Sequence, residues 1–170
     1  FYHYALSNKV LSTVLEEFFA PNLNDVDSIT KSELENFFET KEVGNEERTT
    51  KDILRCFTQF NLIEKANGDE DRYLLTGNRS LPAFVYSLHH ELGDPQMYFV
   101  EDIQDSLTRR AGLFDDEALQ EFIYDGWNAD VWEYSFISDM EQVKLRYNPE
   151  DISSELAGLS ESGAENGVPT

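Results

Sequence analysis

The sequence has one cysteine, few basic residues and no long apolar run, and each of these shortages argues against particular kinds of structure or partner. The single cysteine, Cys56, excludes an internal disulfide framework and a cysteine-based zinc site, and it favours a reducing, cytoplasmic compartment. With no run of about 18 apolar residues, we expect no transmembrane helix, and the first residues do not have the order of a signal peptide. The chain begins without methionine and enters a helical pattern at once, so we expect an upstream portion to be missing.

Positive charge is scarce. The sequence contains 13 Lys and Arg but 34 Asp and Glu, which gives a net charge of -21. Such acidity opposes nucleic-acid binding, since phosphates are repelled by an anionic surface. It indicates either a solubilising or partner-mimicking surface, or the general surface of a halophilic protein from a very salty cytoplasm. The spread of acids along the chain favours the halophilic explanation. At about 1 M salt the Debye length is about 3 Å, so an acidic surface no longer forbids local docking on DNA.

One stretch departs from this acidity. Residues 48–72 contain five bases and five acids, so this stretch is neutral and the rest of the chain carries the whole net charge. We expect a contact with an anionic partner to lie here.

The same region predicts a helix followed by a hairpin. Over residues 49–60, Ile53, Leu54, Phe57 and Phe60 gather on one side of a helix, and polar residues gather on the other. Strands are predicted over 62–65 and 72–75, joined by a turn at Asn67-Gly68. This is the outline of a winged helix-turn-helix, although an ordinary helix and hairpin that bind nothing would give the same pattern.

Two further helices are predicted before this region. Apolar residues recur at helical spacing over residues 1–19, and a capping box, Thr30 to Glu33, predicts the start of a second helix. Thr49 or Thr50 can cap the third helix. The predicted order of helix, helix, turn, helix and hairpin is that of a winged domain.

The second half repeats this order. Helices are predicted over 80–92, 97–109 and 115–127, followed by strands over 131–136 and 143–147. We therefore predict a mainly α fold with small β-hairpins (α+β), arranged either as tandem winged-helix-like units or as one winged domain with a helical and hairpin extension. The predicted domains cover residues 1–77 and 78–148, followed by an acidic, Ser- and Gly-rich flexible tail over 149–170.

No pattern in the sequence indicates catalysis. His89 and His90 are interpreted as surface histidines, because adjacent helical residues point about 100° apart and cannot readily share a metal. Trp127, Trp132 and nearby aromatic residues are interpreted as core and hairpin side chains rather than a base-stacking platform. Nucleotide-binding, hydrolase and metalloprotease motifs are absent from the sequence. We expect no enzymatic activity, no cofactor, no metal and no small-molecule substrate.

Apolar positions over roughly residues 1–65 carry a family resemblance. The matching features are Phe1-Tyr2 with Ala5, a helix over 11–18, Ile29-Thr30 before the helix at 34–38, a helix over 50–60, and Leu62-Ile63. In this order the chain resembles the BrxA-type proteins of BREX phage-defence systems. The resemblance implies a small helical protein with a winged helix-turn-helix that binds double-stranded DNA, catalyses nothing and works beside larger defence proteins. Residues beyond about 78 are not covered by it.

The leading hypothesis is a cytoplasmic DNA-binding protein of a prokaryotic antiviral defence or regulatory system, acting on double-stranded DNA beside other defence-system proteins and away from membranes. The helix would enter the major groove while the wing touches the backbone. The alternative is a protein-interaction module that uses the winged fold and its acidic surface within a larger complex. The predicted DNA-binding residues are Arg48, Lys51, Arg55, Thr58, Gln59, Lys65 and Arg72.

Overall fold

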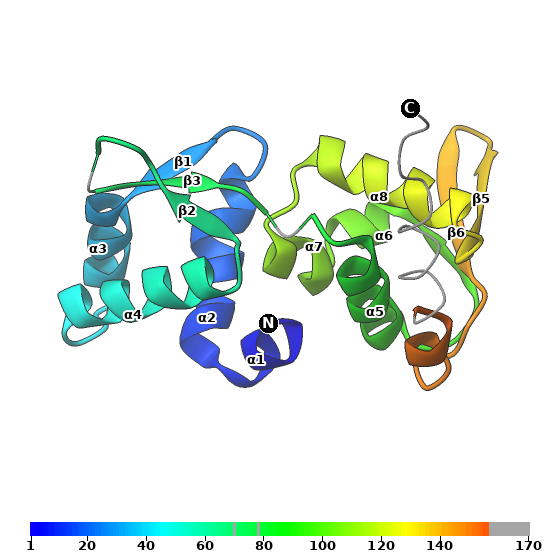
Figure 1. The fold of residues 1–170 in the computed structure, drawn as a ribbon, viewed down its shortest axis with the longest axis horizontal. Coiled ribbons are helices and arrows are strands. Elements are labelled where there is room, and N and C mark those ends of the chain that lie inside the picture. Colours follow the sequence, from blue (N-terminus) through cyan, green and yellow to red (C-terminus); the bar gives the residue numbers. More distant parts are fainter. Residues whose placement is uncertain (70, 78, 157–170) are drawn as a thin grey trace, which may run out of the picture. The chain divides into compact units, whose positions relative to one another are not determined.

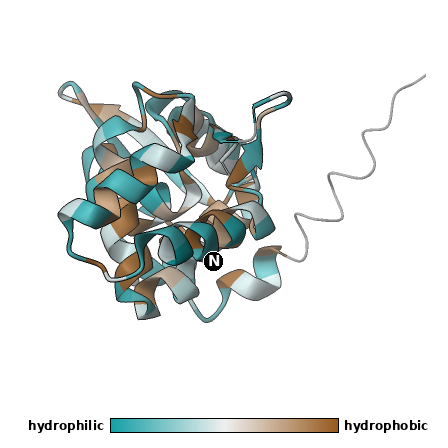
Figure 2. Ribbon diagram, turned by 90° about the vertical axis from the view of Figure 1, so that its left-hand side faces the viewer, coloured by the Kyte–Doolittle hydropathy of each residue, from teal (hydrophilic) through white to brown (hydrophobic). Residues whose placement is uncertain are grey.

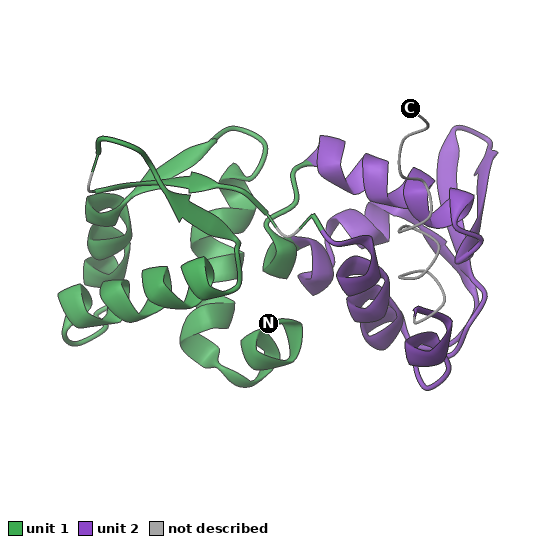
Figure 3. Ribbon diagram, in the orientation of Figure 1, with its two compact units in different colours: residues 1–79, 110–115 green, residues 80–109, 116–170 purple. Residues whose placement is uncertain are grey.

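A computed structural model describes residues 1–69, 71–77 and 79–156 of the chain. The fold is α+β, with helices and two small antiparallel sheets (Figure 1). The chain divides into two compact units, unit 1 (Phe1–Arg79 with Arg110–Asp115) and unit 2 (Ser80–Arg109 with the chain from Asp116 onward) (Figure 3). The segment Arg110–Asp115, which the sequence prediction placed in the second domain, therefore packs with unit 1.

Unit 1 has a three-stranded sheet in the order β1-β3-β2, in which β3 is antiparallel to both neighbours. Its helices have one hydrophilic and one hydrophobic side (Figure 2). Its elements are, in chain order, α1 (Tyr2–Ser7), α2 (Lys9–Val14), a π-helical turn η1 (Leu15–Phe19), a 3-10 turn η2 (Ala20–Asn22), β1 (Ser28–Thr30), α3 (Lys31–Thr40), α4 (Glu46–Gln59), β2 (Ile63–Lys65) and β3 (Arg72–Leu75).

Side-chain caps explain where α2, α3 and α4 of unit 1 begin. The predicted capping box is confirmed, because Glu33 N donates to Thr30 Oγ1 at 3.2 Å and Thr30 N donates to Glu33 Oε2 at 2.7 Å. The single helix predicted over residues 1–19 is wrong. Asn8 has an extended backbone and its side chain caps α2, so the chain breaks there into two helices.

The start predicted for α4 is also wrong. Asn45, with a left-handed backbone, accepts a hydrogen bond from Arg48 N and starts the helix four residues earlier than Thr49 would. Thr50 is instead fully buried inside the helix. α4 thus gains an acidic first turn, Glu46 and Glu47, which suits the positive end of the helix dipole.

In unit 2 a helix, a strand, three helices and a hairpin follow one another, which is one helix more between strand and hairpin than in unit 1. Its sheet order β4-β6-β5 again places the last strand in the centre. The turn between its two hairpin strands is formed by Ser138 and Asp139, both with positive φ. Its elements are α5 (Leu81–Leu92), β4 (Met97–Phe99), α6 (Val100–Gln104), α7 (Leu107–Gly112, whose last residues belong to unit 1), α8 (Asp116–Asn128), β5 (Trp132–Ile137) and β6 (Met140–Leu145).

The continuous helix predicted over residues 97–109 is wrong, because the segment contains a strand and two short helices. The start of α7 is explained by a carboxylate that lies far from it in the sequence. Glu91, on α5, accepts hydrogen bonds from Leu107 N at 2.6 Å and from Thr108 N at 2.7 Å, so it caps α7. Capping by a residue 16 positions away leaves no local sequence signal.

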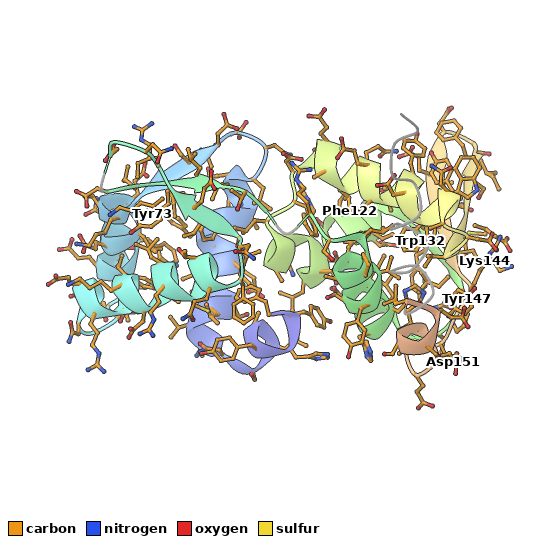
Figure 4. All side chains as sticks on the ribbon, viewed as in Figure 1. Tyr73, Phe122, Trp132, Lys144, Tyr147 and Asp151 are labelled. Atoms are coloured by element: carbon orange, nitrogen blue, oxygen red, sulfur yellow. The ribbon has the colours of Figure 1, made fainter. Side chains whose placement is uncertain are left out.

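The core of unit 2 lies between its helices and the inner face of its sheet, where Phe122 and Trp132 are buried (Figure 4). Residues 152–156, at the start of the predicted flexible tail, form a helical turn that buries Ile152. The rest of the predicted tail, residues 157–170, lies outside the described residues.

Candidate nucleic-acid interface

An open hollow of about 490 Å³ lies between the outer side of α4 and the hairpin of unit 1. We call it the basic hollow, because its charged side chains are all bases. It is lined by Lys31, Lys51, Leu54, Arg55, Thr58, Gln59, Lys65 and Tyr73. The structure therefore brings together Lys51, Arg55, Thr58, Gln59 and Lys65 of the predicted set.

Helical spacing and the pleat of the sheet place these side chains. On α4, Ile53 and Phe57 are buried, which turns Lys51, Arg55 and the end of the helix outward. On the hairpin, Lys65 pairs directly with Tyr73, so both side chains lie on the same face of the sheet. Helix and hairpin thus contribute to one concave surface.

Two of the four bases in the hollow are held by carboxylates. Lys51 Nζ lies 2.7 Å from Glu47 Oε1, and Lys31 Nζ lies 3.1 Å from Glu35 Oε1. The hydrogen bond from Lys51 lowers the pKa of Glu47, so this pair is ionised at neutral pH. The pair of Lys51 with Glu47 is exposed and contributes little stability, whereas the pair of Lys31 with Glu35 is half-buried.

Arg55 and Lys65 form no ion pair with any residue that the structure describes. Both are exposed, one on the helix and one on the hairpin. They are the positive charges in the basic hollow that an incoming anion could meet without first displacing a carboxylate.

The remaining predicted residues, Arg48 and Arg72, lie outside the basic hollow. Arg48 Nε is 3.9 Å from Asp52 Oδ2 near the start of α4. Arg72 pairs across the sheet with Thr30, on the face opposite to Lys65, and its Nε is 3.6 Å from Asp69 Oδ2. The alternation of the strand therefore turns Arg72 away from α4.

Sequence reasoning missed Lys31 and Tyr73. Lys31 reaches the hollow because β1 pairs with β3 and Lys31 N donates to Asp71 O at 2.8 Å. A three-residue strand such as β1 leaves too short a pattern to be recognised. Tyr73 could have been found from its alternation with the exposed Arg72 and Leu74 in the predicted strand.

A second hollow, of about 510 Å³, borders the first and has the opposite charge. It lies between α3 and the first turn of α4, and Lys31 lines both hollows. It is lined by Lys31, Glu35, Asn36, Glu39, Glu46 and Glu47, and we call it the acidic hollow because four of these side chains are carboxylates. The first turn of α4 therefore repels anions, and the surface that attracts them begins beyond this turn, at Lys51, and extends to the hairpin.

The histidine prediction is wrong for His89, which is fully buried in unit 2, whereas His90 is exposed. Nδ1 of His89 lies 2.8 Å from Val85 O, and no described residue forms a hydrogen bond with its Nε2. Burial lowers the pKa of His89. Within the described part of the chain, no three His, Cys, Asp or Glu side chains are placed to hold a metal ion.

We expect the buried His89 to make stability depend on pH. The unfolded imidazole has a pKa of about 6.5 and the buried one a lower pKa, so below about pH 6.5 the unfolded state binds more protons. The free energy of unfolding should therefore fall as the pH drops below about 6.5. Urea unfolding between pH 5 and 8, followed by tryptophan fluorescence, measures this. The fall should be smaller in His89→Leu, and most of it should remain in the control His90→Asn, because burial lowers the pKa of His89 more than His90 does; equal pH dependence in all three proteins would contradict it.

Cys56 is partly exposed, and partial burial raises the pKa of its thiol. Arg109 donates to Asp116 Oδ1 at 2.8 Å and does not line the basic hollow. Trp132 is buried, as predicted, but 48% of Trp127 is exposed.

No helix in residues 1–69, 71–77 and 79–156 has the length and apolar character needed to cross a membrane.

No family model matches this chain, and no curated protein or solved structure matches it significantly.

Proposed function

We propose that this protein binds double-stranded DNA through a winged helix-turn-helix in unit 1, without catalysing a reaction. The observation that carries the proposal is the basic hollow, a concave surface with four bases and no acid on a chain of net charge -21. The position of the basic hollow, between α4 and the hairpin, also supports the proposal. In a winged helix-turn-helix, the helix before the hairpin is the one that enters the major groove, and here that helix is α4.

The dimensions and side chains of α4 suit this role. An α-helix is about 10–12 Å wide with its side chains, and the major groove is about 12 Å wide. Arg55 and Gln59 have the donors that read guanine and adenine edges. Thr58 donates its hydroxyl hydrogen to Leu54 O at 2.8 Å, which leaves its oxygen as an acceptor. Lys65 on the hairpin is placed to contact a phosphate.

The acidic hollow determines how α4 would enter the groove. Recognition helices commonly contact bases through their N-terminal residues, but here that end carries Glu46 and Glu47. We therefore propose that the C-terminal half of α4 contacts the bases while its N-terminal turn is held away from the phosphates.

The proposal predicts binding with a shallow salt dependence. The basic hollow offers four bases, so at most about four phosphates are neutralised and the slope of log K against log salt should not exceed about 3.6 in magnitude. Screening of the acidic surface should reduce it further. A fluorescence anisotropy titration of a labelled duplex, repeated from low to molar potassium chloride, measures both quantities. Absence of binding across the whole range would reject the proposal and favour the protein-interaction module.

We place this activity in a prokaryotic antiviral defence system, on the basis of the BrxA-type resemblance over residues 1–65. The neighbouring genes test this placement independently of DNA binding. A methyltransferase, a large ATPase and a phosphatase-like protein encoded beside this chain would support it, and a neighbourhood without any of them would contradict it.

A further inference from the structure

The junction between the last helix and the hairpin is the same in both units. In unit 1 Leu62 N donates to Phe57 O at 2.9 Å, and in unit 2 Val131 N donates to Gly126 O at 2.9 Å, each residue lying 69 positions after its counterpart. The turn residue before each strand has positive φ, 54° in unit 1 and 62° in unit 2; these residues are Asn61 and Asp130. Residues of α4 and β2 can therefore be matched to residues of α8 and β5.

This match assigns a counterpart in unit 2 to each polar or charged position of α4 and β2 that lines the basic hollow. The counterparts of Lys51, Arg55, Thr58, Gln59 and Lys65 are, in that order, Gln120, Tyr124, Trp127, Asn128 and Tyr134. The three bases of unit 1 are replaced by an amide and two tyrosines. The corresponding surface of unit 2 is therefore aromatic.

These aromatic side chains form one exposed cluster. The ring of Tyr134 lies 5.4 Å from that of Tyr124 and 5.8 Å from that of Trp127, measured between centroids. Tyr124 is 41% exposed and Trp127 48%, and Phe136, two residues along the same face of β5, is 62% exposed. We call Tyr124, Trp127, Tyr134 and Phe136 the aromatic patch.

One carboxylate contacts the aromatic patch, and others are exposed on the helix that carries it. At its edge Glu141 accepts hydrogen bonds from Tyr134 Oη at 2.5 Å and from Gln120 Nε2 at 3.3 Å. Burial and the hydrogen bond to Glu141 raise the pKa of Tyr134, so the phenol is neutral and the only charge at this contact is the carboxylate. Glu117 and Asp125 are exposed on α8, the helix that carries Tyr124 and Trp127.

The bases of unit 2 do not offset this negative charge. Each of them is engaged by a carboxylate, Arg109 by Asp116, Lys144 by Glu133 at 3.5 Å, and Arg146 by Asp130. The aromatic patch thus lies in a negative field with no base at hand to hold a phosphate.

We propose that the aromatic patch docks an arginine-rich segment of a partner protein. Exposed indole and phenol rings attract cations over their faces, and the carboxylates around them add to this attraction. Arginine suits the site better than lysine, because its planar guanidinium stacks on rings while it donates to carboxylates. Nucleic acid also stacks on aromatic side chains, but it needs a basic groove for its phosphates. The inference rests on unit 2 alone and does not depend on DNA binding by unit 1.

The test measures binding of a synthetic nine-residue peptide of alternating arginine and glycine to the full chain. Fluorescence anisotropy of the labelled peptide is followed at physiological ionic strength, where the Debye length is about 8 Å and distant carboxylates are screened. We expect binding to the wild type and at least about tenfold weaker binding to Tyr124→Ala with Trp127→Ala. Both substitutions leave the net charge unchanged, so the loss cannot come from a weaker overall field.

Three controls sharpen the result. The conservative variant Trp127→Phe should bind within about threefold of the wild type, since the ring is retained. Tyr4→Ala, at another exposed aromatic position, should have no effect. A peptide with citrulline in place of arginine should bind at least about tenfold more weakly, because it keeps the shape and loses the charge.

Two results would overturn the proposal. If the Tyr124→Ala, Trp127→Ala protein holds the arginine peptide as tightly as the wild type, the peptide is held by the acidic surface in general. If single-stranded DNA binds the wild type and loses affinity in the same variant, the patch stacks bases and takes nucleic acid instead. Circular dichroism of each variant confirms that the fold is retained before binding is compared.

Discussion

Reversing the charge of Arg55 and Lys65 together should weaken duplex DNA binding at least about 100-fold, which corresponds to about 2.7 kcal/mol. These two bases of the basic hollow have no ion pair among the described residues, so replacing them removes two direct contacts with phosphates or bases. The two new carboxylates would then face DNA from both sides of the hollow, and like charges at close range cost more than the lost contacts. The measurement is the anisotropy titration of Arg55→Glu with Lys65→Glu against wild type.

The control is a second double reversal, Arg48→Glu with Arg72→Glu. It changes the net charge by the same amount and lies in the same neutral stretch of the sequence, but both side chains are outside the basic hollow and beside a carboxylate. We expect a loss of no more than about tenfold, from the long-range field alone. Equal losses in the two variants would mean that net charge, and not the hollow, governs binding.

A salt series separates the two variants further. Each phosphate contact that is removed reduces the slope of log K against log salt by about one. The reversal inside the hollow should therefore flatten the slope by about one, because Lys65 is the proposed phosphate contact, whereas the control should leave it nearly unchanged. A slope that is the same in all three proteins would contradict the assignment of Lys65 as a phosphate contact.

The sequence predicted the long amphipathic helices well, because their buried positions recur at a spacing that no other structure produces. α8 and the body of α4, although not its start, show this, and the capping box placed the start of α3 to the residue. The hairpins were also predicted, since each combines alternation with a turn. What these elements have in common is that their determinants lie within a few residues of one another.

The features that the sequence did not reveal depend on contacts between distant residues. β1 and β4 have three residues each, and they are strands only because β3 and β6 lie beside them. α7 begins where Glu91 caps it from another helix. His89 packs against the ring of Trp132, a residue of β5 that lies 43 positions further along the sequence.

The candidate site shows the same division. The helical face of Lys51, Arg55, Thr58 and Gln59 was predicted, because it is a property of a single helix. Lys31 was missed, because only the pairing of β1 brings it to the hollow. The separation of the surface into a basic and an acidic hollow also escaped prediction, because the sequence shows only the average charge of the region.

The buried pair Gly126 and Trp132 provides a large expected effect on stability. A Cβ atom added to Gly126 would lie 2.0 Å from Cζ2 of the Trp132 ring. The ring has no room to retreat, because it is fully buried and its indole N–H donates to Ile123 O at 2.9 Å. In unit 1 the matching positions are Phe57 on the helix and Ile63 on the strand. Unit 1 therefore places the larger side chain on the helix, whereas unit 2 places it on the strand and has glycine on the helix. Volume, rather than residue type, is what the two units share here.

We therefore expect Gly126→Ala to lower the free energy of unfolding by about 2–3 kcal/mol, even though alanine favours helices by about 1 kcal/mol over glycine. The matched control is Gly44→Ala, whose new Cβ meets nothing within 4 Å, and which should change stability by no more than about 0.5 kcal/mol. Urea unfolding followed by circular dichroism measures both. The penalty should shrink when Trp132→Ile is combined with Gly126→Ala, because the smaller side chain leaves room for the methyl group. A penalty of the same size in both backgrounds would show that crowding against Trp132 is not its cause.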